Sequence, residues 1–140
     1  MSKFIRLRPA RLALTLLVFM TFILTAIGLA LIFQPTRWSN TPAYANLLEV
    51  AGQRTWGAIH LAVAAVMAAA AVPPHRRELL VAAHTASIGL VAFWLIAFVV
   101  RYLTNDGTTV VNVLSWTTYL FLLTLSSALM DLMYDHRPPG

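Results

Sequence analysis

The chain has 140 residues, of which 59% are hydrophobic and only 11% are charged, whereas soluble domains usually carry about 25% charged residues. The net charge of +5 comes from Lys and Arg residues that flank long apolar runs, where such residues orient membrane spans and meet anionic lipid headgroups. This placement excludes a nucleic-acid-binding surface, and the lack of cysteine excludes disulfides, thiolate metal sites and thiol catalysis.

Four apolar runs account for nearly the whole chain. A helix that crosses about 30 Å of hydrocarbon needs about 20 mostly apolar residues, and the runs at about 12–33, 55–72, 79–100 and 110–133 reach or approach that length. The first run is longer than the roughly 7–15 apolar residues of a secretory signal peptide, so we expect it to be retained as a span. The sequence therefore predicts an all-α polytopic membrane protein, a four-transmembrane-helix bundle that forms a single membrane domain over residues 1–140.

The second run is rich in alanine and ends at Pro73-Pro74. Two pairs of its alanines have small-xxx-small spacing: Ala58 with Ala62, and Ala65 with Ala69. Small residues at this spacing let helix backbones approach closely in lipid. We therefore expect this helix to pack against its neighbours.

A short amphipathic helix is predicted at about 41–52, in the loop between the first two runs. Pro42 suits its first turn, and Gly52 suits its end. Tyr44, Leu47 and Leu48 lie on the same face of this helix. We therefore expect this segment to lie at the membrane surface and to lead into the second span.

The second span opens with a tryptophan beside a glycine, Trp56-Gly57, followed by His60. A glycine at the membrane interface indicates that another helix packs closely there, and the amphipathic segment is the candidate. We assign packing or partner contact to six residues around this loop: Tyr44, Leu47, Leu48, Trp56, Gly57 and His60.

The distribution of Lys and Arg predicts that both termini are cytoplasmic. With that orientation the inner side carries seven basic residues: Lys3, Arg6, Arg8, Arg11, Arg76, Arg77 and Arg137. The outer side carries three: Arg37, Arg54 and Arg101. Seven against three satisfies the positive-inside rule, so we expect the first loop to lie on the outer face of the membrane.

Two histidines, His60 and His84, lie within the spans. Ionisable groups in spans are candidates for function, and histidine pairs in helical bundles can ligate haem or a metal. Counting about 1.5 Å per residue from opposite membrane faces puts these two roughly 15 Å apart in depth, too far for one ion to bridge. We expect each histidine to hydrogen-bond across helices or to interfacial water, with cofactor ligation as the alternative.

Asp131 is the one carboxylate within a predicted span. One interpretation places it at the membrane interface, near the inner end of the fourth span. The other pairs it with His84, which lies at a similar level. A proton relay would need further carboxylates deeper in the membrane, and the spans contain none.

The fourth span is the most polar, and at 100° per residue its polar side chains form two stripes. The first stripe holds Asn112, Ser115, Tyr119 and Ser126, and the second holds Thr117, Thr124 and Asp131. Such stripes form interhelical hydrogen bonds or, in an oligomer, line a water-filled path. Our candidate intramembrane polar residues are His84, Asn112, Ser115, Thr124 and Asp131.

The tryptophans and tyrosines lie mostly near the span ends, where the aromatic belt of the membrane interface accounts for them without a ligand. The sequence contains no nucleophile elbow, no HExxH pair and no glycine-rich phosphate loop. We therefore expect no enzymatic activity, no catalytic residue, no metal ligand and no cofactor.

The stretches SNTPAY (39–44) and WGAIHL (56–61), with the span layout over roughly residues 12–75, resemble small four-span membrane proteins of actinobacterial phages. That group comprises holin-like and lysis-cassette membrane proteins. The resemblance implies a protein of the bacterial inner membrane that permeabilises the membrane, or regulates its permeabilisation, during host cell lysis. Most holins have one to three spans, so an accessory or antiholin role fits four spans as well.

On this hypothesis the protein self-associates in the bilayer, through the alanine-rich face of the second span and the polar face of the fourth. Its partners are lipid and either further copies or another membrane protein. Three alternatives stay open. They are a non-catalytic accessory or structural subunit of a membrane complex, a superinfection-exclusion protein that uses the outer loop as its contact surface, and a haem-binding electron carrier.

Overall fold

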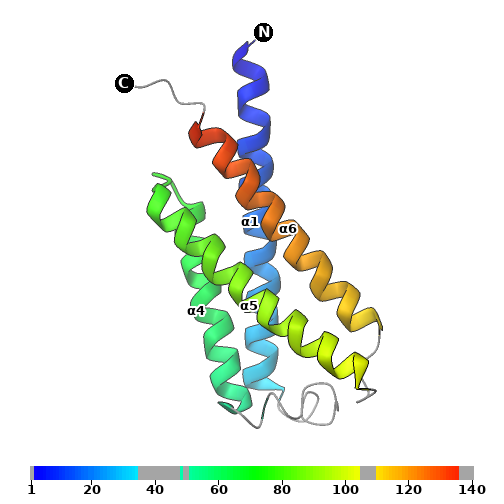
Figure 1. The fold of residues 1–140 in the computed structure, drawn as a ribbon. Helices are drawn as coiled ribbons and strands as arrows, with labels where there is room; N and C mark the ends of the chain where they lie inside the picture. The colour runs from blue at the N-terminus through cyan, green and yellow to red at the C-terminus, as the bar shows by residue number, and fades with distance from the viewer. Residues whose placement is uncertain (1, 35–47, 49–50, 105–109, 136–140) are drawn as a thin grey trace.

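Four long helices form the protein, within the residues that the structure describes (Figure 1). The structure, a computed structural model, describes residues 2–34, 48, 51–104 and 110–135, and side chains for residues 11–132 of these. The helices are α1 (Ser2–Phe33), α4 (Gln53–Ala71), α5 (Arg77–Leu103) and α6 (Val110–Asp135). Each contains a stretch that is long and apolar enough to cross a membrane. The prediction of an all-α chain with four helices of membrane-spanning length is therefore confirmed.

The helices extend beyond the predicted apolar runs. The basic arm before the first run is the beginning of α1, which starts at Ser2. α5 begins at Arg77 and ends at Leu103, and so includes polar residues at both ends. Backbone hydrogen bonding continues through interfacial residues whose side chains are polar, so hydropathy gives the apolar section of a helix and not its ends. Glu78 in the first turn of α5 and Arg101 in its last turn also suit the helix dipole.

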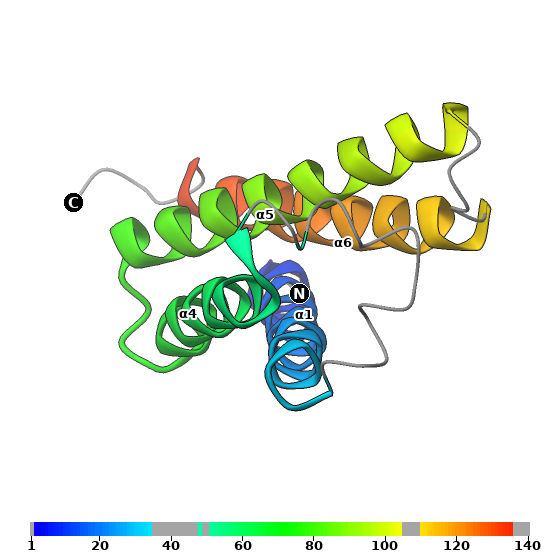
Figure 2. The same cartoon turned by 90° about the horizontal axis from the view of Figure 1, so that it is seen from below.

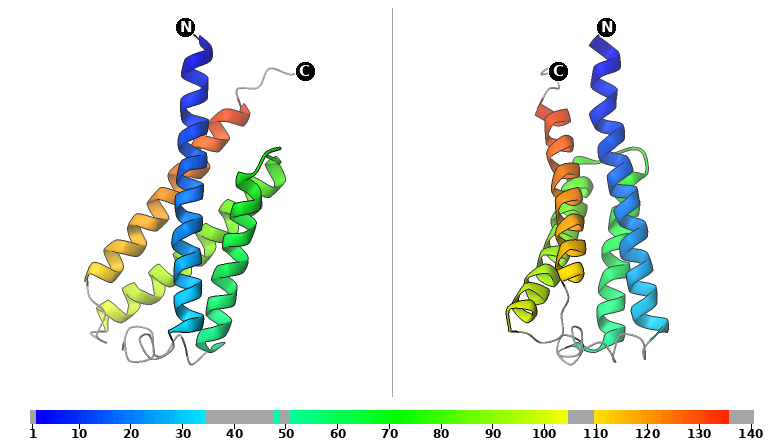
Figure 3. Two further views of the ribbon diagram at one scale, coloured as in Figure 1. Left: turned by 180° about the vertical axis from the view of Figure 1, so that it is seen from behind. Right: turned by 90° about the vertical axis from the view of Figure 1, so that its right-hand side faces the viewer.

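The four helices pack as two crossed layers. α1 and α4 form one antiparallel layer, and α5 and α6 form the other (Figure 3). Viewed from below, α1 and α4 are seen nearly end-on while α5 and α6 lie across the view (Figure 2). Contacts of α1 with α6 and of α4 with α5 join the layers.

The two ends of the bundle differ in which segments meet there. The terminal end holds the start of α1, the connection from α4 to α5 and the last turns of α6 (Figure 1). The loop end holds the last turns of α1 and α5 and the first turns of α4 and α6. The first turns of α1 and the last turns of α6 thus lie at the same end of the bundle.

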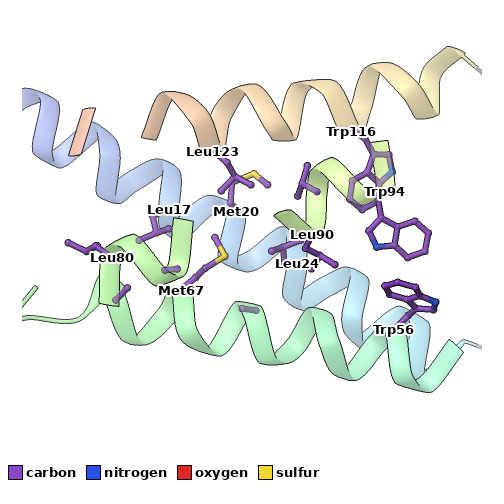
Figure 4. Close-up of a cluster of buried hydrophobic side chains, with 14 of the residues drawn as sticks. Leu17, Met20, Leu24, Trp56, Met67, Leu80, Leu90, Trp94, Trp116 and Leu123 are labelled. Atoms are coloured by element: carbon purple, nitrogen blue, oxygen red, sulfur yellow. The ribbon is translucent and has the colours of Figure 1, made fainter. Parts of the chain in front are cut away.

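Each helix turns one face to a shared core. The buried residues of α1 recur at intervals of three or four, as one packed helical face requires: Ala13, Leu17, Met20, Leu24, Gly28 and Leu31. Leucines and methionines from all four helices fill the space between the layers (Figure 4). Large apolar side chains such as Phe22 and Phe121 lie exposed on the outside, where a bilayer would solvate them.

Two glycines let α1 and α4 approach closely near the loop end. A Cβ atom on Gly57 would lie 2.6 Å from Ile32 Cγ1 and 2.8 Å from the carbonyl oxygen of Gly28. A Cβ atom on Gly28 would lie 2.9 Å from Leu61 Cγ and 3.0 Å from the carbonyl oxygen of Gly57. Both positions therefore require glycine because the two backbones lie too close together for a side chain, and not because glycine is conformationally free.

Gln53 joins the start of α4 to the end of α1. Its Nε2 atom donates a hydrogen bond of 2.7 Å to the carbonyl oxygen of Leu31. Leu31 belongs to the last four residues of α1, whose carbonyl groups have no partner within the helix. The bond therefore satisfies a backbone acceptor at the end of one span with a side chain from the next.

Most of the predicted amphipathic segment, 41–52, lies outside the described residues. Of its contact face the structure describes Leu48, which is buried. The N–H group of Gly52 donates to the carbonyl oxygen of Leu48 at 2.7 Å, and Gly52 has a φ of +72°, which favours glycine. Gly52 therefore ends one turn and immediately precedes α4, at the position where we predicted a stop.

Candidate functional site

An aromatic cluster fills the core near the loop end. Trp94 of α5 is its centre, with ring centroids 5.2 Å from Trp56 of α4 and 5.7 Å from Trp116 of α6. Phe98 stacks on both Trp94 and Trp116 at 5.9 and 5.8 Å. Figure 4 shows the three tryptophans lying together, each from a different helix. Because aromatic pairs stabilise beyond their buried area, this cluster holds α4, α5 and α6 in register.

The cluster corrects our interpretation of three of the four tryptophans as members of an interfacial belt, while Trp38 lies outside the described residues. Trp56, Trp94 and Trp116 are all buried, so their rings contact one another and not lipid headgroups. Tyr102, near the end of α5, is exposed and is placed as a belt residue would be. The position of a tryptophan or tyrosine along the sequence does not show on which side of its helix the ring lies.

His60 borders the aromatic cluster from α4. Its side chain is fully buried, and its ring lies 5.7 Å from that of Trp94. Nδ1 lies 2.7 Å from the carbonyl oxygen of Trp56 in the preceding turn, and a carbonyl can only accept, so Nδ1 carries a proton and donates it. Nε2 has no hydrogen-bond partner among the described residues. His60 thus donates a hydrogen bond to a carbonyl of its own helix. Among the described residues it forms no hydrogen bond to another helix.

His84 makes the polar link between helices that His60 does not. Its Nδ1 lies 2.8 Å from the carbonyl oxygen of Leu80, and its Nε2 lies 2.9 Å from Ser126 Oγ of α6. Ser126 Oγ in turn donates to the carbonyl oxygen of Ala13 on α1, also at 2.9 Å. His84 is 4% exposed, and Ser126 and Ala13 are fully buried. One short chain of polar atoms therefore connects α5, α6 and α1 toward the terminal end.

A groove of about 470 Å³ lies beside this link, between α5 and α6. His84 lines it together with polar and charged side chains from both helices: Arg77, Thr85, Ser127 and Asp131. Leu80, Ile88 and Met130 supply part of its apolar wall. Asp131 and His84 thus face one groove, as the pairing hypothesis required, while the bond that His84 makes to α6 goes to Ser126. Asp131 itself is exposed.

The two polar stripes of α6 lie in different surroundings. The first stripe faces the bundle, since Asn112, Ser115 and Tyr119 are half-buried and Ser126 is buried. The second stripe, Thr117, Thr124 and Asp131, faces outward. Four hydroxyl groups bond back to carbonyl oxygens four residues earlier: those of Ser115, Thr117, Thr118 and Thr124. These groups are satisfied inside their own helix, and Ser126 is the hydroxyl of α6, within the described residues, that bonds to another helix.

This difference predicts unequal effects for two substitutions on α6. Ser126→Ala should destabilise the protein by about 1 kcal/mol, the usual range for an interhelical hydrogen bond in a membrane protein. Thr124→Val, which removes a hydroxyl bonded only within its own helix, should change the free energy of unfolding by less than about 0.5 kcal/mol. Reversible unfolding in mixed micelles measures both. Equal losses for the two variants would contradict the assignment of Ser126 as the interhelical link.

His60 and His84 stay far apart in the bundle. His60 packs against Trp94, and Trp94 lies ten residues along α5 from His84, which is about 15 Å of helix. Among the described residues no group of three or more His, Cys, Asp or Glu side chains could hold a metal ion. The two histidines therefore face separate surroundings, one aromatic and one polar.

Leu48 and His60, two of the six contact residues assigned around the first loop, are described above, and the other four fall into three groups. Tyr44 and Leu47 lie outside the described residues. Trp56 packs on Phe93 and Trp94 of α5, at 5.2 Å in each case, and Gly57 packs on α1. Within the described residues the helix that packs on Gly57 is thus α1. The amphipathic segment, our predicted neighbour of Gly57, lies mostly outside those residues.

Ser126 lies on a predicted polar stripe but was not among our candidate residues, and Ala13 was not among them either. The stripe was the available signal for Ser126, because its position matches the inward-facing Asn112, Ser115 and Tyr119. No sequence signal points to Ala13, since its contribution is a backbone carbonyl. Comparison of the chain with protein-family models, characterised proteins and solved structures gave no match.

Proposed function

We propose that the protein is a holin-like or lysis-accessory protein of the bacterial inner membrane, and that it acts by self-association. Four helices able to cross a membrane support the membrane location. The resemblance of the first loop and spans to lysis-cassette proteins supplies the biological context. The exposed alanine face of α4 is the observation that carries the self-association.

The alanines of the small-xxx-small pairs lie outside the bundle. They are all exposed: Ala58, Ala62, Ala65 and Ala69. α4 uses its other face, with Gly57, Ala64 and Met67, to pack against its neighbours. The outward alanines therefore offer a second copy a surface that a helix backbone can approach closely. The outward threonines of α6 form the second surface in this proposal.

A single copy is too well packed to open a path across the membrane. Leucine, methionine and tryptophan side chains fill the core between the two layers among the described residues (Figure 4). A permeable state in this proposal therefore forms between copies, where polar side chains of α6 such as Thr117 and Thr124 line the contact. Both termini lie in the cytoplasm, which puts most Lys and Arg residues on the inner side.

Induced expression in a bacterial host tests the proposal. Expression of the natural sequence should collapse the membrane potential and admit a small dye. Ala62→Phe places a large ring on the exposed face of α4 and should strongly reduce both effects, because it keeps helix backbones apart. Ala86→Phe changes an exposed alanine of α5 and should leave both effects in place. An unchanged potential at high expression of the natural sequence would exclude pore formation.

Cysteine cross-linking tests the contact itself, because the natural chain has no thiol. Under oxidising conditions in membranes, Ala65→Cys should yield disulfide-linked dimers. Ala86→Cys is the matched control and should stay monomeric on the same gel. Dimers from Ala86→Cys alone would move the contact from α4 to α5.

The filled interior favours one second candidate, an accessory subunit of a larger membrane complex. In that role the alanine face of α4 would receive a helix of another protein. This candidate predicts co-purification with one fixed partner, no loss of membrane potential on expression, and no dimer from Ala65→Cys. The expression and cross-linking experiments therefore distinguish the two candidates.

A further inference from the structure

The groove between α5 and α6 reaches from the terminal end of the bundle toward its middle. Along α5 its lining residues run from Arg77, the first residue of that helix, to Gly89. This stretch of helix is about 18 Å long, against about 15 Å for half of the hydrocarbon of a bilayer. The volume of about 470 Å³ lies within the range of small-molecule sites, roughly 300–1,000 Å³. The groove therefore has the length of one leaflet and room for a ligand.

The mouth of the groove carries one positive and one negative side chain. Arg77 begins α5 and Asp131 lies about one turn before the end of α6, so both stand at the terminal end (Figure 1). Both are exposed and line the groove. A guanidinium binds a phosphate through two parallel hydrogen bonds, and a carboxylate accepts from an ammonium. The pair therefore matches a ligand that carries a phosphate and an ammonium, and Asp131 would repel a purely anionic one.

Beyond the charged pair, the lining of the groove offers a hydroxyl group and then an apolar end. Ser127 lines the groove one turn further along α6 than Asp131, about 6 Å deeper, and its hydroxyl can donate to an ester carbonyl. Ile88 and Gly89 line the deep end. A Cβ atom on Gly89 would meet nothing within 4 Å, so this end has space for a chain. Charged headgroup, ester and acyl chain follow one another in the same order along a phospholipid.

We propose that this groove binds one phospholipid of the phosphatidylethanolamine type. The phosphate of the lipid lies against Arg77, its primary ammonium lies against Asp131, and one acyl chain runs past Ile88 to Gly89. Soluble phosphoethanolamine lacks the chain that the deep end accommodates, and an anionic lipid lacks the ammonium. Lipid binding here needs only a membrane location and does not depend on self-association.

Competition among three lipids tests the proposal. The protein in detergent is mixed with equal amounts of phosphatidylethanolamine, phosphatidylcholine and phosphatidylglycerol of identical acyl chains, and native mass spectrometry counts the lipid retained. One phosphatidylethanolamine molecule should be retained about fivefold more often than either competitor, because the choline headgroup has no N–H to donate and the glycerol headgroup has no cation. Equal retention of the three lipids, a preference for another of them, or no retention would overturn the proposal.

Two charge variants should have different effects in the same competition. Asp131→Asn removes the partner of the ammonium, so the ratio of phosphatidylethanolamine to phosphatidylglycerol retained should fall about fivefold. Arg77→Gln weakens the contact with a phosphate that all three lipids share, so it should lower the retention of all three and preserve that ratio. Arg76→Gln changes an exposed arginine outside the groove and should preserve both retention and ratio. A ratio that survives Asp131→Asn would contradict the assignment of the headgroup.

Two leucine variants locate the acyl chain. Gly89→Leu places a side chain at the deep end of the groove, where a Cβ atom meets nothing within 4 Å. The variant should therefore fold and lose most of its retained phosphatidylethanolamine. Ala128→Leu adds the same side chain at an exposed position of α6 outside the groove and should retain the lipid. Circular dichroism checks that both variants fold, and equal retention by the two would exclude this groove as the lipid site.

Discussion

Replacing Gly57 with leucine should force α1 away from α4 and destabilise the folded protein by about 3 kcal/mol or more. The first added carbon already lies 2.8 Å from the carbonyl oxygen of Gly28, and a backbone atom cannot move aside as a side chain can. The rest of the leucine side chain would meet Ile32, whose Cγ1 atom lies 2.6 Å from the same carbon. Unfolding in mixed micelles, followed by circular dichroism, measures the loss.

Smaller changes at glycine show whether space is the cause. Gly57→Ala should be destabilising by about 1–2 kcal/mol, because the close approach costs more than the helix propensity gained. Gly89 of α5 is the matched control, since a Cβ atom there meets nothing within 4 Å. Gly89→Ala should therefore stabilise the protein, by up to about 1 kcal/mol. Equal effects at the two positions would show that α1 and α4 are not in close contact at Gly57.

Truncating Trp94 to alanine should cost about 3–5 kcal/mol, the range for removing a buried tryptophan from a core. Trp94 touches Trp56 on α4, Trp116 on α6 and the ring of His60, so its loss leaves a cavity between three helices. Near-ultraviolet circular dichroism should lose the signal of the stacked tryptophans together with the stability. The same unfolding assay gives the free energy.

An exposed phenylalanine provides the control for Trp94. Phe121 on α6 is 64% exposed, so Phe121→Ala removes a large ring without opening a cavity. Its effect on the free energy of unfolding should stay within about 0.5 kcal/mol. Trp94→Phe should be intermediate, because the stacking contact survives in part. A loss for Phe121→Ala as large as that for Trp94→Ala would show that the aromatic cluster has no special role.

Hydropathy predicted the four spans because each apolar run is long and because Pro73-Pro74 separates the second from the third. The helix ends were missed, at Ser2 and at Leu103 for example, because polar residues near an interface continue a helix as readily as apolar ones. The separation of the two histidines along the bundle was likewise predictable. Helix counting separated His60 from His84 by about 15 Å, and the contacts of the two side chains agree with that separation.

Lateral packing could not be predicted, because it depends on two helices at once. Two alanine pairs of α4 have small-xxx-small spacing, yet these alanines face outward and Gly57 makes the close contact. The partner of Gly57 is Gly28 on α1, and only the register between the helices identifies it. The same reason explains the aromatic cluster, since Trp56, Trp94 and Trp116 meet only after three helices have packed.

For the polar contacts, the positions of the side chains on α6 could be predicted, but their hydrogen-bond acceptors could not. Periodicity put Ser126 on one stripe and Thr124 on another, and in the structure the two stripes differ in burial. Periodicity does not identify the backbone carbonyl that accepts each hydrogen bond. The hydroxyl of Thr124 bonds to a carbonyl of its own helix, and the hydroxyl of Ser126 bonds to a carbonyl of α1. Backbone acceptors have no sequence signature, so the link through Ala13 emerges only from the packed helices.

The crossed layers also determine how the protein meets bilayers of different thickness. α4 has 19 residues and α5 has 27, which correspond to about 28 and 40 Å of helix, against roughly 30 Å of hydrocarbon. In a bilayer α4 would therefore match the hydrocarbon only when nearly upright, whereas α5, which slants across α1 and α4 in Figure 1, would fit by tilting. A thinner or thicker bilayer changes the slant of α5 and α6 more than that of α4, because tilting is how a long helix accommodates mismatch.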